Sequence, residues 1–116
     1  MPKKFMRSFK YARAGVEHIM RTQRNIWIHF FAGLAVLLAA FWLRISPAET
    51  AIIVLTIAFV IVTEMINTAV EEIVNLVKPE PHPLAGLVKN IAAGAVLVAS
   101  AGAVVIGILI FIPRVI

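Results

Sequence analysis

Four polar side chains recur at helical spacing within an otherwise apolar stretch of the sequence. Glu64, Asn67, Glu71 and Asn75 are separated by three, four and four residues. At about 100° per residue, this spacing places them on one stripe of a helix, with Thr68 inside it. Carboxylate oxygens are ligands that Mg²⁺ prefers, and a carboxylate can also accept a proton from a substrate. The stripe is therefore a candidate site for metal or acid–base chemistry.

The depth of this stripe in a membrane bears on its role. Glu64 lies thirteen residues beyond Ala51, which is roughly 20 Å along the apolar part of the helix, and Glu71 lies roughly 30 Å along it. A carboxylate at membrane depth is unfavourable and indicates function. A stripe that only joins helices by hydrogen bonds is the alternative, and it stays open for Asn67 and Thr68. Glu72, beside the stripe, is interpreted as a solvated charge near the helix end.

Other polar side chains fall on the membrane side toward which the stripe descends. Lys89 and Asn90 open the next apolar helix, and His82 lies in a proline-rich loop. A lysine at a membrane boundary is usually an anchor at the headgroups, but opposite carboxylates it could also bind a metal-chelated phosphate. His82 could contact a ligand or be solvated. His29, within the first apolar stretch, is interpreted as a hydrogen-bonded interface residue rather than a metal ligand.

The elements that must position these residues are all helical. The spacing of apolar and basic residues predicts an amphipathic surface helix over 3–22, and three apolar stretches predict transmembrane helices over 26–43, 48–77 and 84–112. Ser46 is a predicted N-cap, with Pro47 at the first helical position. Three prolines between 79 and 83 end the second span. We therefore expect an all-α integral membrane protein with one domain over 1–116.

Composition supports a membrane protein and excludes several other classes. Hydrophobic residues make up 61% of the chain and charged residues 15%, with no cysteine to form a disulfide or thiolate site. The net charge of +5 does not indicate nucleic acid, because seven of the eleven Lys and Arg residues lie in the first 24 positions. Such a block ahead of apolar spans predicts a multi-pass protein with a cytoplasmic N-terminus. Few helices shield the polar stripe, and a small-residue face on the last helix could pack a second chain, so we expect a homo-oligomer.

Several motifs resemble one known family over essentially the whole chain. The segment 64–71 reads EMINTAVE, 82–85 reads HPLA, 89–97 reads KNIAAGAVL, and 8–12 reads SFKYA. An E-x-x-N-[ST]-A-[IV]-E pattern in a small three-span protein resembles the prokaryotic diacylglycerol kinase family, which includes undecaprenol kinases. The resemblance implies a homotrimer in the bacterial inner membrane, with active sites shared between subunits, that transfers the γ-phosphoryl group of ATP to a lipid alcohol with Mg²⁺.

The resemblance also implies roles for individual residues. The family's catalytic base falls on Glu64, with Asn67 in support, and its metal-binding glutamates fall on Glu71 and Gln23. Its nucleotide contacts fall on Tyr11, Glu80, His82, Lys89 and Asn90. Gln23 departs from the family pattern, because a neutral amide is a weaker Mg²⁺ ligand than a carboxylate. Asn75 and Asn90 stand where aspartates are common, and Trp27 stands where an arginine is common.

Three functions compete on these observations. The first is a lipid kinase, and the HPLA segment favours undecaprenol over diacylglycerol by analogy. The second is a small proton-coupled carrier that uses Glu64, although a carrier gives no reason for Glu71, His82 and Lys89 to gather at one edge. The third is a catalytically silent family member, which the amides at positions 23, 75 and 90 favour.

Overall fold

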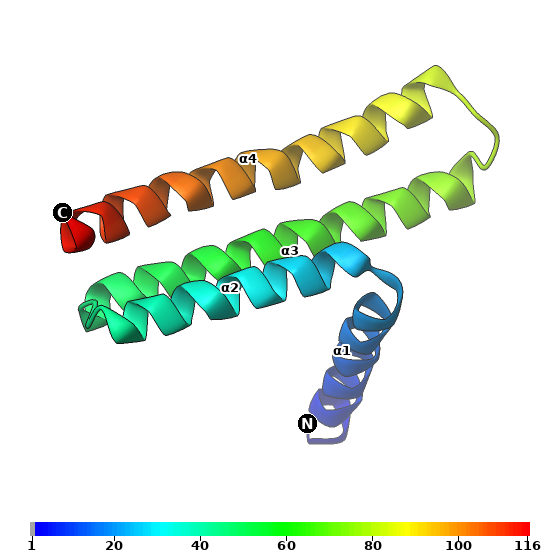
Figure 1. Cartoon of the computed structure of the whole chain (residues 1–116). Coiled ribbons are helices and arrows are strands. Elements are labelled where there is room, and N and C mark those ends of the chain that lie inside the picture. Colours follow the sequence, from blue (N-terminus) through cyan, green and yellow to red (C-terminus); the bar gives the residue numbers. More distant parts are fainter. Residues whose placement is uncertain (1) are drawn as a thin grey trace.

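The chain forms four helices, three of which are long and apolar enough to cross a membrane. The computed structural model describes residues 2–116. Its helices are α1 (Pro2–Thr22), α2 (Arg24–Trp42), α3 (Pro47–Val77) and α4 (Pro83–Val115). Helices α2 and α3 lie side by side, α4 returns along α3, and α1 projects away from the start of α2 (Figure 1). The predicted fold class, a surface helix followed by three apolar spans, is therefore confirmed.

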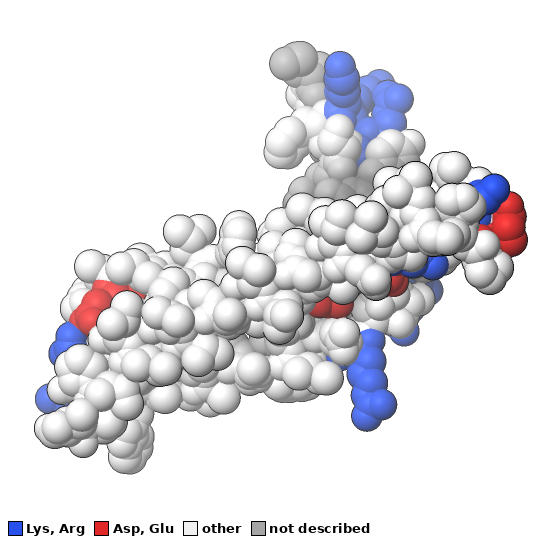
Figure 2. Space-filling view, turned by 90° about the horizontal axis from the view of Figure 1, so that it is seen from above, with Lys and Arg blue, Asp and Glu red and all other residues white. Residues whose placement is uncertain are grey.

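Apolar side chains cover most of the outside of these helices. Phe41 and Trp42 are 86% and 84% exposed, and many other large hydrophobic side chains are also exposed. Charged side chains gather on α1 and at the ends of the long helices, and an uncharged stretch lies between them (Figure 2). In water such a surface would drive aggregation, whereas hydrocarbon solvates it. The exposed apolar middle is therefore the surface that faces lipid.

Helix α1 meets α2 at a sharp corner. Gln23 separates the two helices with an extended backbone, φ −111° and ψ 109°, and its side chain makes no capping hydrogen bond. The indole Nε1 of Trp27 donates to the backbone oxygen of Met20 at 2.6 Å and so fastens the corner. A basic amphipathic helix fixed at an angle to a span can lie along the membrane surface.

The turn between α2 and α3 closes the opposite end of the bundle. The backbone N–H of Ile45 donates to the backbone oxygen of Ala40, and the backbone N–H of Arg44 donates to that of Phe41. These two hydrogen bonds form a Schellman motif. Ile45, Ala40, Ile53 and Ile110 form the buried core at this end. Ser46 caps α3 as predicted, because its hydroxyl accepts from the backbone N–H of Glu49 at 3.2 Å.

The last helix ends later than the sequence suggests. A helix over 84–112 is predicted to stop before Pro113, but α4 continues through Pro113 to Val115. Proline removes only one backbone donor in the last turn, where few intrahelical bonds remain to be lost. The extra turn carries Arg114, whose guanidinium pairs with the Glu49 carboxylate. This ion pair joins the end of α4 to the start of α3.

The Schellman motif predicts the effect of one substitution on stability. Arg44 has φ of 54°, in the left-handed region where a Cβ atom is unfavourable. Arg44→Gly should raise the free energy of unfolding by about 1 kcal/mol, measured by titration with SDS in mixed micelles. Arg44→Ala is the control, since it removes the charge but keeps the Cβ atom. Equal gains in both variants would assign the effect to charge rather than to the backbone.

Candidate functional site

Glu64 is the most buried ionisable side chain among the described residues and faces the start of α2. It is 3% exposed. Its Oε1 lies 3.5 Å from the amide Nδ2 of Asn25, and its Oε2 lies 3.6 Å from Nε2 of His29. Asn25 and His29 are four residues apart and therefore share one face of α2. Each carboxylate oxygen is thus opposite a nitrogen from the neighbouring helix.

These contacts fix the depth of Glu64 relative to the first span. His29 is five residues beyond Arg24, the first residue of α2, which corresponds to about 7 Å along the helix. Glu64 therefore lies close to one end of α2 rather than at mid-membrane. Counting along α3 alone places Glu64 deeper in the membrane, because it treats all 31 residues of α3 as membrane-spanning. The end of α3 instead extends past the start of α2. The site is therefore near the end of the bundle at which α2 begins.

The polar stripe on α3 continues from Glu64 toward this face. Thr68 is buried and its hydroxyl donates to the backbone oxygen of Glu64 at 3.1 Å. Asn67 is also buried, and its Nδ2 donates to Oε1 of Glu71 at 3.4 Å. The Oδ1 atom of Asn67 has no hydrogen-bond partner within residues 2–116. A buried acceptor without a donor is unfavourable, so this atom is suited to a ligand.

Lys89 joins the stripe from α4. Its Nζ donates to Oδ1 of Asn75 at 2.6 Å and so links the end of α3 to the start of α4. The stripe therefore places a primary ammonium one helical turn beyond the Glu71 carboxylate. An anionic ligand and a bound cation could both be held at this end.

The remaining predicted site residues are distributed over α1, the loop before α4 and α4, and within residues 2–116 no hydrogen bond or ion pair joins them to one another. Tyr11 is on α1 and is 68% exposed. Glu80 pairs with Lys78 at 3.1 Å in the loop before α4. His82 caps α4 through Nδ1, which accepts from the backbone N–H of Leu84 at 3.1 Å, a role that the sequence did not predict. Asn90 is exposed on α4.

The oxygen donors at this end fit a Mg²⁺ ion that is also bound by a phosphate ligand. They do not form a metal site built from protein side chains alone. Within the described residues, no group of three or more His, Cys, Asp or Glu side chains could hold a metal ion. Mg²⁺ usually binds through one or two carboxylates and fills its octahedron with water and substrate phosphates. The Glu71 carboxylate is one such ligand, and the unpaired amide oxygen Oδ1 of Asn67 is a further oxygen on the same stripe. Gln23, at the corner between α1 and α2, could add an amide oxygen.

Sequence analysis did not predict that Asn25 and His29 face Glu64. The available signal was the spacing of four residues between two polar side chains at the start of an apolar span. That spacing predicts a shared face, but it does not show which helix the face contacts. The antiparallel packing of α2 on α3 supplies the missing information.

The fold and site define a small membrane protein with an acid–amide stripe that reaches one membrane face. Residues 10–111 match the model of the prokaryotic diacylglycerol kinase family. The chain belongs to this family. The predicted family and the predicted class, a kinase of membrane lipids, are therefore confirmed.

Individual relatives carry two different names. A diacylglycerol kinase of Synechocystis is 44% identical over 91% of this chain, which spans 61% of that protein's length. An undecaprenol kinase of Bacillus subtilis is 40% identical over 96% of this chain and 90% of its own length. A diacylglycerol kinase of Escherichia coli K12 is 34% identical over 71% of this chain and 73% of its own length.

The contact between Asn25 and Glu64 can be tested through stability. Asn25→Asp places a second carboxylate beside the buried one and should lower the free energy of unfolding by about 1–3 kcal/mol. Adding Glu64→Gln to that variant restores a carboxylate–amide pair with the partners exchanged, and it should recover most of the loss. SDS titration of both variants measures this. A double variant no more stable than Asn25→Asp would mean that the two side chains are not in contact.

Proposed function

We propose that this chain transfers the γ-phosphoryl group of ATP to the hydroxyl of a membrane lipid at the cytoplasmic face of the bacterial inner membrane. The observation that carries the proposal is the burial of Glu64 opposite Asn25 and His29, close to a membrane face. A lipid hydroxyl reaches that depth from the bilayer, and a nucleotide reaches the adjacent residues from water. Membership of a lipid kinase family supports the same reaction.

Glu64 is the proposed general base. As the lipid oxygen attacks the γ-phosphorus, its proton passes to the Glu64 carboxylate. A bond forms between that oxygen and phosphorus, while the bond from phosphorus to the β–γ bridging oxygen breaks and ADP leaves. The amide of Asn25 holds one carboxylate oxygen, and the other, 3.6 Å from Nε2 of His29, would accept the proton. Positioning of this kind supplies much of the catalysis in phosphoryl transfer.

The polar end of the stripe is the proposed nucleotide site. Mg²⁺, when bound, neutralises charge on the phosphate oxygens. Glu71 and Asn67 would hold it, with Gln23 as a further oxygen donor. Lys89 would exchange its hydrogen bond with Asn75 for one with a phosphate oxygen. The proposed contacts to the rest of the nucleotide are Tyr11 on α1, Glu80 and His82 in the loop between α3 and α4, and Asn90 in the second turn of α4.

The distribution of positive charge supports a cytoplasmic site. Helix α1, the start of α2 and the loop between α3 and α4 lie at the same end of the bundle (Figure 1). Seven basic residues of the first 24, together with Lys78 and Lys89, belong to that end, whereas Arg44 and Arg114 are at the other. An excess of Lys and Arg marks the cytoplasmic side of membrane proteins.

A homotrimer is the proposed assembly. Beyond Thr68, α3 extends past the start of α2, so no residue of α2 flanks Glu71 or Asn75. On α4, Ala99 is buried within the chain, whereas Ala95 remains exposed for close packing by another helix. A second subunit could therefore cover the stripe. Native mass spectrometry in mild detergent measures the assembly, and an active monomer would contradict it.

The proposed roles predict that Glu64 and Glu71 fail differently when neutralised. Glu64→Gln should lower kcat by at least about a hundredfold and leave the KM for Mg·ATP nearly unchanged, because the base acts in the transition state. Glu71→Gln should raise the KM for Mg·ATP and be partly rescued by more Mg²⁺. Steady-state kinetics with radiolabelled ATP distinguish them, and Glu72→Gln, one residue away, is the control. Similar defects in both variants would refute the division of roles.

Gln23 provides the converse experiment. If its side chain reaches the metal, Gln23→Glu adds a carboxylate and should lower the Mg²⁺ concentration needed for half-maximal rate by several fold. A magnesium titration of the variant and the native chain measures this. An unchanged or higher requirement would place Gln23 outside the metal site.

Undecaprenol is the proposed acceptor in preference to diacylglycerol. The support is the match to the undecaprenol kinase, which extends over 96% of this chain and 90% of that protein. Offering each lipid to purified protein with radiolabelled ATP should give a higher kcat/KM for undecaprenol. Clear selectivity for diacylglycerol would overturn the preference, and no transfer to either lipid would favour a catalytically silent member.

A further inference from the structure

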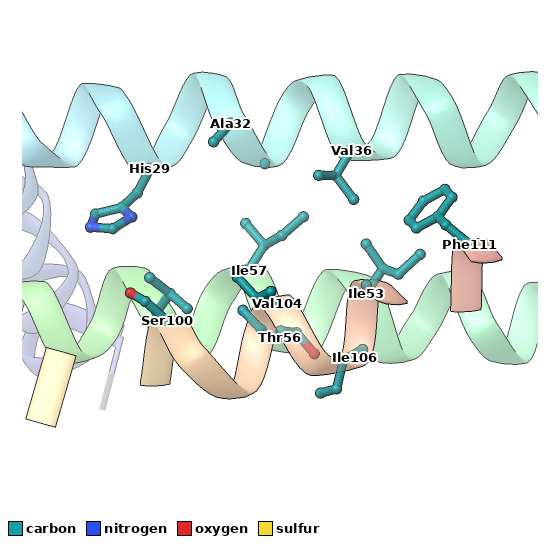
Figure 3. A pocket seen from close by; sticks show the side chains of 14 residues that line it. His29, Ala32, Val36, Ile53, Thr56, Ile57, Ser100, Val104, Ile106 and Phe111 are labelled. Carbon is teal, nitrogen blue, oxygen red and sulfur yellow. The ribbon is translucent and has the colours of Figure 1, made fainter. Parts of the chain in front are cut away.

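An apolar cavity of about 370 Å³ lies between α2, α3 and α4. Side chains from α2 point toward those of α3 and α4 across it (Figure 3). Its lining is hydrocarbon except at a few points: His29, Thr56 and Ser100. The Thr56 hydroxyl donates to the backbone oxygen of Ile52 at 2.7 Å, so its proton is already used within its own helix. The cavity is therefore suited to a hydrocarbon ligand.

Unequal packing of the three helices produces this cavity. Helices α2 and α3 approach closely at Gly33, where an added Cβ atom would lie 2.7 Å from Cγ2 of Ile57. Helix α4 presents small residues to the same region, including Ala103 and Gly107. A Cβ atom added at Gly107 would meet nothing within 4 Å. The small side chains of α4 thus leave space here instead of closing it.

The cavity begins at the candidate active site and runs away from it. His29 lines its near end and lies 3.6 Å from Glu64. On α3 the lining extends from Val60 back to Ile53, about 10 Å toward the opposite face, and on α4 from Ser100 to Phe111, about 16 Å. A lipid whose hydroxyl is at Glu64 must direct its chain away from the aqueous side, and the cavity provides a course in that direction.

We propose that this cavity binds the hydrocarbon chain of the lipid alcohol that accepts the phosphoryl group, beginning with the segment nearest the hydroxyl. The inference rests on the proposed kinase function. A volume of about 370 Å³ is at the lower end for ligand pockets, so it holds part of one chain and excludes a second. The acceptor class that fits is an alcohol joined to a single chain, with the remainder of the chain in the bilayer.

The cavity would contribute to catalysis by positioning the lipid hydroxyl, and little to the affinity for the lipid chain. Lipid tails are as apolar as the lining, so moving a chain from bilayer to cavity gains little hydrophobic free energy. Confining the first segment beside His29 instead fixes the hydroxyl relative to Glu64. Misplacement by about 1 Å can slow an enzyme about a hundredfold. A filled cavity should therefore impair use of the lipid acceptor and leave nucleotide binding intact.

Two glycines on α4 provide a matched pair of variants. Gly107 lines the cavity and Gly102 does not, and an added Cβ atom meets nothing within 4 Å at either position. Gly107→Leu should lower kcat/KM for undecaprenol about tenfold or more, with the KM for Mg·ATP changed less than about twofold. Gly102→Leu should behave as the native chain. Equal kinetics in the two variants would overturn the inference.

Photolabelling tests occupancy without requiring turnover. A single-chain alcohol with a diazirine near its hydroxyl end, incorporated with the full chain into bilayers, should label residues such as Val36, Ile57 and Val104. Gly107→Leu should abolish that labelling and Gly102→Leu should retain it. Transfer to undecaprenol without labelling of the cavity would refute the binding site. Labelling without any transfer would instead contradict the proposed kinase function.

A second copy of the chain is the competing occupant. If a neighbouring helix fills the cavity, Gly107→Leu should disperse the oligomer in native mass spectrometry while Gly102→Leu leaves it intact. That result would overturn the proposal. An unchanged assembly in both variants, with the lipid defect confined to Gly107→Leu, supports it.

Discussion

The buried carboxylate of Glu64 requires polar partners, and the neighbouring helix α2 supplies them. An ionisable group within a membrane bundle is stable only if polar neighbours replace the water that it has lost. Here α2 supplies Asn25 and His29, one nitrogen opposite each carboxylate oxygen. These two residues lie in the first two turns of α2. The carboxylate is therefore near the end of this span, where in the proposed reaction a water-soluble phosphate donor would meet a lipid.

The rest of the bundle is held together at the opposite end. There the Schellman turn at Arg44, the apolar core around Ala40 and Ile53, and the pair between Glu49 and Arg114 close the helices. Four other apolar side chains of the described residues are buried outside this core, and the cavity beside α2 reaches it, because Ile53 belongs to both. The cavity thus runs from the candidate site to the closed end of the bundle.

Much of this architecture can be read from the sequence because it depends on local rules. Apolar stretches of membrane length predict the spans, the capping pattern at Ser46 predicts the start of α3, and helical spacing predicts the stripe from Glu64 to Asn75. The family motif adds roles for individual residues. What local rules do not give is the register between helices. The partners of Glu64, the bond from Lys89 to Asn75 and the cavity all depend on that register.

Helix length explains why the proposed site would be at the edge and not the centre of the membrane. Helix α2 has 19 residues and is about 27 Å long, close to the thickness of a bilayer core of about 30 Å, whereas α3 has 31 residues and is about 45 Å long. Both helices begin or end at the same closed turn, so the excess length of α3 must project at the other face. Glu64 is opposite the start of α2, and Glu71 and Asn75 fall on the projecting part. A single helix thus carries one carboxylate buried against the start of α2 and, two turns later, a second one on the part that projects beyond α2. That is the arrangement that the proposed transfer from a soluble phosphate donor to a membrane alcohol needs.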